Sequence, residues 1–205
     1  MMRHRAQYEK YARFQRVPKE RKGAMIEIKF IGRGGQGAVI ASQILAKVFF
    51  IMGKYPQCFS VFGGERRGAP VASFLRVDEK KIFLKCEILR PDAMIYMAPD
   101  LVDEAEVASV LKPKGLIVIN NALTTNEFPG LRKFRLALVD ALAISEGLGM
   151  GATINTAILG AFARSSGSVP MDCLEQAIRE TVPAKIEANV AAARKAYELT
   201  RIVSD

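Results

Sequence analysis

The sequence predicts an α/β fold: a three-layer single domain with a mixed, mostly parallel sheet and a helical C-terminal third. Apolar runs of strand length alternate with helical patterns between residues 26 and 139. A glycine-rich turn joins the first run to the first helix, and the patterns after about residue 150 are helical. A chain of 205 residues with 50% hydrophobic side chains is long enough to bury one core.

The first half of the chain is expected to alternate between strands and one helix. A strand at 26–31 precedes a helix at about 38–52. Short apolar runs follow at 56–61, 70–77 and 81–85. Because only Asp78-Glu79-Lys80 separates the last two runs, they predict a hairpin, which would make the sheet mixed.

The middle of the chain has the pattern of buried parallel strands. Ala93–Met97 and Leu116–Asn120 are continuous apolar runs on either side of a helix expected at about 100–110. Phe134–Val139 is a further expected strand. These elements would complete the sheet.

The last third is expected to hold three helices. The first, Asn155–Ser165, is rich in small residues that permit a neighbouring element to approach closely. Asp172 is expected to cap a helix over Cys173–Glu180, and Pro183 to occupy the first turn of a helix that runs to about Arg201. The glycines of 147–151 before them indicate either a flexible loop between the sheet and these helices or a loop at a subunit contact.

Residues 1–24 form a basic N-terminal extension, and residues 25–205 the expected domain. The extension holds eight basic side chains against two acidic ones. Tyr8, Tyr11 and Phe14 recur at a spacing that would make a narrow apolar stripe on a short helix able to dock on a partner. The alternative is a disordered basic tail, with Met25 as a second possible start, because termini are poorly ordered unless something holds them.

Two glycine-rich segments carry the chemistry. The first is Gly32-Arg33-Gly34-Gly35-Gln36-Gly37, between the first strand and the first helix. Glycines there let the backbone approach a ligand, and the free N–H groups of a helix start favour an anion. The second is Gly63-Gly64-Glu65-Arg66-Arg67-Gly68-Ala69-Pro70, where two guanidinium groups could bind phosphate or carboxylate.

Each segment also has a simpler explanation. Gly32, Gly34 and Gly37 fit the dinucleotide fingerprint, but Met52–Gln57 lacks the acidic residue that an NAD site needs about 20 residues further on. The arginine segment could be a solvated charged turn. Both segments are expected at the same end of successive strands, which favours a shared site.

In order and spacing, these two segments, with Gly53-Lys54-Tyr55 between them, make the chain resemble the gamma subunit of the 2-oxoacid:ferredoxin oxidoreductases, in the pyruvate and ketoisovalerate branch. The resemblance covers about residues 25–200. It implies a non-catalytic unit in a complex that decarboxylates a pyruvate, branched-chain or aryl 2-oxoacid with thiamine diphosphate, Mg²⁺ and iron–sulfur clusters, commonly delivering the acyl group to coenzyme A. Alpha, beta and ferredoxin-like delta subunits and an external ferredoxin or other acceptor are the implied partners.

The resemblance also implies where this chain meets the ligand. Near the coenzyme A or active-site entrance it places Gly32, Arg33, Gly34, Gly35, Gln36 and Gly37, together with Glu65, Arg66, Arg67 and Gly68. The alternative from another class is a free-standing NAD-binding enzyme or redox sensor. The 2-oxoacid, the product as thioester or free acid, the terminal acceptor and the stoichiometry stay open.

The rest of the sequence favours a chain that binds no cofactor alone. Its one histidine, His4, lies in the extension, so the domain has no imidazole for acid–base work. Cys58, Cys86 and Cys173 cannot supply the four thiolates of a cubane cluster. The three scattered cysteines and the lack of a secretory segment predict a cytoplasmic protein. No run reaches the ~18 apolar residues of a membrane span, and because the excess positive charge is concentrated in the extension, nucleic acid is not an expected partner.

Overall fold

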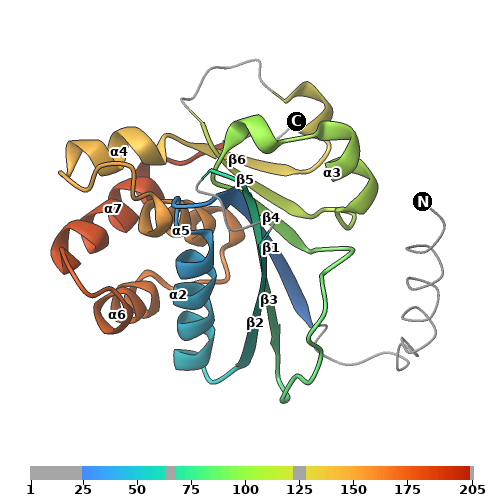
Figure 1. The fold of residues 1–205 in the computed structure, drawn as a ribbon, viewed down its shortest axis with the longest axis horizontal. Coiled ribbons are helices and arrows are strands. Elements are labelled where there is room, and N and C mark those ends of the chain that lie inside the picture. Colours follow the sequence, from blue (N-terminus) through green and yellow to red (C-terminus); the bar gives the residue numbers. More distant parts are fainter. Residues whose placement is uncertain (1–24, 63–67, 122–127, 204–205) are drawn as a thin grey trace.

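The computed structural model describes residues 25–62, 68–121 and 128–203, in which seven strands form one sheet with helices on both faces (Figure 1). In spatial order β2-β3-β1-β4-β5-β6-β7, β1, β4, β5 and β6 run parallel, β3 is antiparallel to both neighbours, and β7 is antiparallel to β6. The strands are β1 Ile26–Arg33, β2 Tyr55–Phe62, β3 Pro70–Asp78, β4 Ala93–Tyr96, β5 Leu116–Asn120, β6 Arg135–Val139 and β7 Arg201–Val203. The expected mixed sheet and three-layer fold are confirmed.

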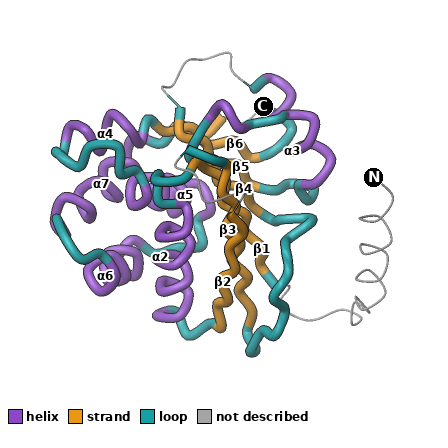
Figure 2. The backbone as a smooth tube through the Cα atoms, in the orientation of Figure 1, coloured by secondary structure: helices purple, strands orange, loops and turns teal. Residues whose placement is uncertain are grey.

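The helices cover the two faces of the sheet unequally, as Figure 2 shows. They are α2 Ala38–Ile51, α3 Glu104–Val110, α4 Ala141–Gly147, α5 Asn155–Ser166, α6 Met171–Thr181 and α7 Ile186–Leu199. All but α3 lie on one face, and α3 packs on the other together with a 3₁₀ turn at Pro129–Leu131. The helical last third is thereby confirmed.

The central strands alternate their side chains between two cores. In β4, Ala93 and Ile95 pack toward the α2 and α5 face, whereas Met94 and Tyr96 pack toward α3. All four residues are buried. This double burial explains why the strand reads as a continuous apolar run in the sequence.

The small residues of α5 permit the close helix contact that the sequence predicts. A Cβ added at Gly160 would lie 2.0 Å from the carbonyl oxygen of Ala193 in α7. No side chain fits at that distance, so α5 and α7 pack backbone against backbone at this point. The pair forms part of the core on the α2 face.

The hairpin predicted over 70–77 and 81–85 is wrong. β3 pairs with β2 on one side and with β1 on the other, so the hairpin is β2–β3. Residues 81–85 are in neither helix nor strand. Phe83 and Leu84 lie on the surface, and their apolar sequence misled the prediction because it carries no information about which strand would pair with it.

Three expected helices differ in their bounds. The segment at about 100–110 divides into a 3₁₀ turn, Pro99–Leu101, and α3, because Asp103 caps α3 through the N–H groups of Ala105 and Glu106. Helix α6 begins at Met171, so Asp172 lies inside its first turn instead of capping it from outside.

Pro183 does not begin the last helix. It follows Val182, the residue that ends α6, in the position where proline commonly follows a helix end. Helix α7 begins at Ile186 after Lys185, whose φ is 51°. Helix α4 and strand β7 were not predicted, and the glycine loop of 147–151 joins α4 to α5 instead of joining the sheet to α5.

Several expectations lie outside the described residues. They include the extension 1–24 with its stripe of Tyr8, Tyr11 and Phe14, and the side chains of Glu65, Arg66 and Arg67. Within the described ranges, no helix has the length and apolar character needed to cross a bilayer.

Candidate ligand-binding edge at the glycine turns

The parallel strands β1 and β4 end side by side where the chain changes direction across the sheet. Helix α2 follows β1 onto one face, whereas α3 follows β4 onto the other (Figure 1). In open α/β sheets, ligands bind outside the carboxyl ends of the strands at such a switch point. The first glycine segment lies at this edge, since it follows β1 directly.

The first glycine segment forms a closed turn. The Arg33 N–H donates to the Gln36 side-chain oxygen at 2.7 Å, and the Gln36 N–H donates to the Arg33 carbonyl at 3.0 Å. Gly35 and Gly37 adopt φ of 97° and 86°, which favour glycine. Gln36, one of the predicted site residues, therefore shapes the turn with its own side chain.

The glycines of this turn have different roles. A Cβ at Gly32 would lie 3.2 Å from Met97 Cβ, and one at Gly37 would lie 3.3 Å from Asn155. A Cβ at Gly35 would meet no heavy atom within 4 Å. Gly32 and Gly37 thus permit internal packing, whereas the space beside Gly35 is open to a ligand.

The start of α2 adds hydrogen-bond donors to this edge. Its first intrahelical bond runs from the Ala41 N–H to the Gly37 carbonyl at 2.8 Å. The N–H groups of residues 38–40 have no acceptor inside the helix, and Gly37 makes no side-chain cap. Together with the helix dipole, these donors favour an anion.

The two glycine segments lie side by side, as the sequence predicts. The Gly34 N–H donates to the Ala69 carbonyl at 2.9 Å, and the Gly68 N–H donates to the Gly34 carbonyl at 3.3 Å. These bonds extend the β1–β3 ladder beyond its last pair, Arg33 with Pro70. Gly68 is therefore beside the first glycine turn; its predicted companions Glu65, Arg66 and Arg67 lie outside the described residues.

Arg33 connects three segments at this edge. Its Nη1 donates to the Gly68 carbonyl at 3.0 Å, and its Nε donates to Asp100 Oδ2 at 3.1 Å, with Nη2 bonded to the same oxygen. The Arg33 hydrogen bond holds the pKa of Asp100 below its ordinary value. The Arg33 guanidinium thus has protein partners, and its position supports the turn as well as any ligand contact.

Asp100, Met97 and Asn120 are residues of this edge that the sequence analysis missed. Asn120 donates to the Met97 carbonyl at 3.1 Å and accepts from the Ala141 N–H at 3.0 Å, which fixes the ends of β4 and β5 against the start of α4. All three residues stand at or just after the carboxyl end of a predicted parallel strand. That position was the signal that could have identified them.

The described side chains near this edge are poorly suited to proton transfer. Burial, followed by the charges of Glu106 and Asp103, raises the pKa of Tyr96, which keeps its hydroxyl protonated. Farther from this edge, in β2, burial also raises the pKa of the Cys58 thiol to about 11. No group of His, Cys, Asp and Glu in the described part of the chain is arranged to hold a metal ion.

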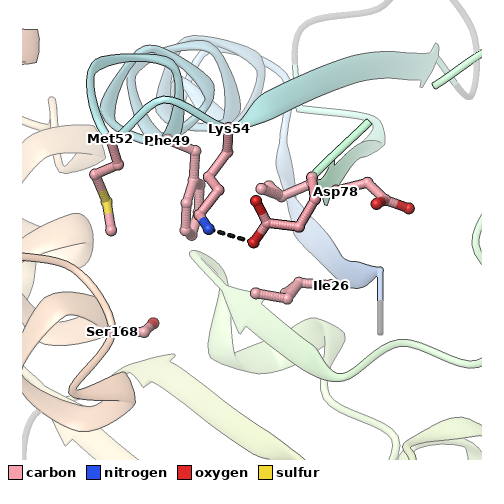
Figure 3. A pocket seen from close by; sticks show the side chains of 8 residues that line it. Ile26, Phe49, Met52, Lys54, Asp78 and Ser168 are labelled. Atoms are coloured by element: carbon pink, nitrogen blue, oxygen red, sulfur yellow. Dashed lines mark hydrogen bonds and ion pairs between the residues drawn. The ribbon is translucent and has the colours of Figure 1, made fainter. Parts of the chain in front are cut away.

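A cavity of about 170 Å³ lies at the opposite, amino edge of the parallel strands (Figure 3). Ile26, Phe49, Met52 and Val77 provide its apolar wall, and the ion pair of Lys54 with Glu79 lies beside it. It contains none of the predicted site residues.

The topology argues against the dinucleotide-binding alternative. In the dinucleotide fold, the strand after the first helix is parallel to the first strand and adjacent to it. Here the antiparallel strand β3 separates β2 from β1. The ribose-binding acid of that fold would have no equivalent place next to the glycine turn.

The structure defines a three-layer α/β protein whose two glycine segments lie side by side at the carboxyl ends of the parallel strands. Residues 27–199 match the pyruvate ferredoxin/flavodoxin oxidoreductase family, and the chain belongs to that family. The predicted resemblance to its gamma subunits is confirmed.

Individual relatives agree with this assignment. The chain is 46% identical over 183 residues to the pyruvate/ketoisovalerate oxidoreductases common subunit gamma of Pyrococcus furiosus, covering 87% of this chain and 98% of the relative. It is 46% identical over 176 residues to the pyruvate synthase subunit PorC of Methanothermobacter thermautotrophicus, covering 85% and 95%. The crystal structure of pyruvate oxidoreductase subunit PORC from Thermotoga maritima superposes with a TM-score of 0.74 at 32% identity, covering 87% of this chain and 98% of that one.

Proposed function

We propose that this chain is the non-catalytic gamma subunit of a thiamine-diphosphate-dependent 2-oxoacid:ferredoxin or acceptor oxidoreductase, and that its glycine edge helps form the coenzyme A entrance. The observation that carries the proposal is the contact of the two glycine segments through Gly34, Gly68 and Ala69. Pyruvate and ketoisovalerate are the proposed substrates, because the names of the relatives above include these 2-oxoacids.

The residues at the glycine edge fit an anionic ligand. The space beside Gly35 lets a ligand approach the backbone, and the free N–H groups at the start of α2 can donate hydrogen bonds to a phosphate oxygen. Arg33 holds the Gly68 carbonyl and Asp100 in fixed positions on either side. Arg66 and Arg67, next to Gly68 in the sequence, would add bidentate contacts to the same anion.

The cofactors of the complex are proposed to belong to its other subunits. Thiamine diphosphate would supply the decarboxylation chemistry, and iron–sulfur clusters the electron path. A cubane cluster needs four thiolates, whereas this chain has three cysteines, Cys58, Cys86 and Cys173, none in a disulfide. Alpha, beta and ferredoxin-like delta subunits and an external ferredoxin are the proposed partners, in a reducing, cytoplasmic setting.

The proposal assigns the two parts of the chain different roles. Residues 25–205 are the subunit domain, and the basic residues 1–24 form an extension that is not needed for the ligand site. The loop of 147–151 is proposed to reach a subunit contact. Lys185 supports that loop by donating to the Gly149 carbonyl at 2.5 Å.

The arginine pair provides the test of the coenzyme A role. In the assembled complex, Arg66→Lys and Arg67→Lys keep both charges but lose bidentate geometry, which typically costs about 1.5–3 kcal/mol per contact, or roughly 10- to 150-fold in an equilibrium constant. We expect a raised KM for coenzyme A with little change in kcat. A matched Arg13→Lys, Arg16→Lys variant in the extension should change neither.

Two other results would assign the arginine pair a role other than ligand binding. Dissociation of the complex in the Arg66→Lys, Arg67→Lys variant, seen by sedimentation, would assign the pair to a neighbouring subunit. A normal KM for coenzyme A in an intact complex would mean that this segment is a solvated turn. In that case, Arg66 and Arg67 would not bind coenzyme A.

A further inference from the structure

The connection between β3 and β4, residues 79–92, is the longest segment without helix or strand inside the described ranges. We call it the β3–β4 segment. It runs along the sheet on the side away from α2 (Figure 1). Connections of this length inside a compact domain usually serve a function. The segment lies at the amino edge of β1 and β4, away from the glycine turns.

Contacts with the sheet hold this segment in a fixed path. The side chain of Arg76, which is 3% exposed, donates to the carbonyls of Cys86 at 2.7 Å and Glu87 at 3.1 Å. Glu27 accepts from the same guanidinium at 3.1 Å. Ile88, the next residue along the chain, is buried. The segment is therefore built to keep one shape.

The fixed path leaves large apolar side chains in solvent. Phe83 is 79% exposed, Leu84 46% and Leu89 56%. The Arg76 contacts hold Cys86 and Glu87, the residues between Leu84 and Leu89, beside the sheet. Apolar side chains that gather on a rigid part of a surface commonly mark an interaction site.

The charges around this apolar group are mainly positive. Within the described residues, Lys80, Lys81, Lys85 and Arg90 form no ion pair, and Lys81 lies 5.4 Å from the centre of the Phe83 ring. Of the three acids in the segment, Glu79 is paired with Lys54 and Asp92 with Lys112, whereas Glu87 is exposed, so the basic side chains outnumber the acidic ones. An apolar centre with a charged rim is the usual composition of a protein interface. A complementary partner would present an apolar surface rimmed with carboxylates.

We propose that the β3–β4 segment docks on another protein subunit of the same oxidoreductase complex. The occupant is an apolar patch on that subunit, flanked by Asp and Glu side chains that face Lys81 and Lys85. This inference rests on the proposed function, since it takes the partner from the complex. It adds a contact that is separate from the glycine edge.

The test compares variants of the exposed side chains within the reconstituted complex. Phe83→Ser with Leu84→Ser should raise the Kd for the partner subunits about tenfold or more, because apolar anchors dominate binding at the centre of an interface. The matched control is Phe50→Ser, which removes another exposed aromatic, 63% exposed on α2, and should leave the Kd within about twofold.

A second pair of variants tests the charge of the partner. Lys81→Glu with Lys85→Glu should weaken assembly and reduce its dependence on salt, whereas Lys195→Glu on α7 should do neither. In the wild-type complex, amide hydrogens of residues 81–90 should exchange more slowly than in the free chain. Unchanged melting temperatures will show that all variants are folded.

Three results would overturn the inference. The first is an unchanged Kd for both pairs together with unprotected amides in the complex. The second is binding of the free chain to vesicles of phosphatidylserine that is lost in the Phe83 variant while the complex assembles normally. The third is self-association of this chain that the same variant abolishes. If the wild-type chain joins no complex at all, the proposed function fails. If the wild-type chain joins the complex but the variants bind as well as it does, only the docking inference fails.

Discussion

The two edges of the sheet are each held by one arginine, but the two arginines differ in burial. At the carboxyl edge, the half-exposed Arg33 bonds to Asp100 and to the Gly68 carbonyl. At the amino edge, the buried Arg76 bonds to Glu27 and to the carbonyls of Cys86 and Glu87. Exposed ion pairs add little stability, whereas breaking a buried pair leaves a charge without its partners. We infer that Arg76 maintains the fold and that Arg33 positions a site.

The largest expected effect comes from removing the buried arginine. Arg76→Leu leaves two carbonyls without their donor and leaves Glu27 with Lys112 as its remaining ion-pair partner, and breaking a buried pair typically costs about 3–5 kcal/mol. For a chain of this size that corresponds to a fall in Tm of roughly 6–20 °C. Thermal unfolding followed by circular dichroism measures it. The control is Arg194→Leu, which breaks the exposed pair with Glu175 and should shift Tm by only a few degrees. Equal falls in Tm for the two variants would contradict the claim that the buried arginine contributes more to stability than an exposed one.

A smaller effect is expected at the glycine turn. Gly37→Ala places a side chain at φ 86°, with its Cβ 3.3 Å from Asn155, and should cost about 1–2 kcal/mol. Gly147→Ala is the matched control, because it lies at the end of α4 with nothing within 4 Å of its Cβ and should be neutral or slightly stabilising. Urea unfolding of both variants gives the comparison. A Gly37 variant as stable as wild type would mean that the turn tolerates another backbone shape.

The smallest expected effect is a shift in the pKa of the Asp100 carboxyl, at the carboxyl edge. Hydrogen bonding to Arg33 lowers the pKa of Asp100. A lowered carboxyl pKa means that the contact is fully present above the ordinary value of about 3.9 and is lost as pH falls through the depressed pKa. Carbon NMR of the Asp100 carboxyl should show this depressed midpoint. Arg33→Met should return the midpoint toward the ordinary range, and a midpoint that stays depressed in that variant would assign the effect to another neighbour.

The elements that the sequence predicted well are those whose side chains are buried on both faces. β4 and β5 appear as continuous apolar runs because each faces two cores. The run at 81–85 has a similar composition, but Arg76 holds its neighbours to the sheet while Phe83 points to solvent. Composition does not show which runs find a partner strand, so this prediction was wrong.

The candidate site was predicted in part. The glycine segments were expected together because each ends a strand at the same edge, and the Gly34 contact with Ala69 confirms it. Asp100 was not foreseen, because its partner Arg33 is 67 residues away and no local pattern connects them. Gln36 and Arg33 were expected to face a ligand, but both also support the turn. Local patterns locate a turn, whereas its internal bonds depend on tertiary packing.

The central claim is that this chain acts only as a subunit, and activity measurements test it most directly. The purified chain should show no 2-oxoacid-dependent reduction of a viologen dye, with pyruvate or ketoisovalerate and coenzyme A present. The complex recovered under anaerobic conditions with the tagged chain should contain thiamine-binding subunits and reduce the dye. Dye reduction by the isolated chain, or recovery of the tagged chain with no such subunits, would contradict the account.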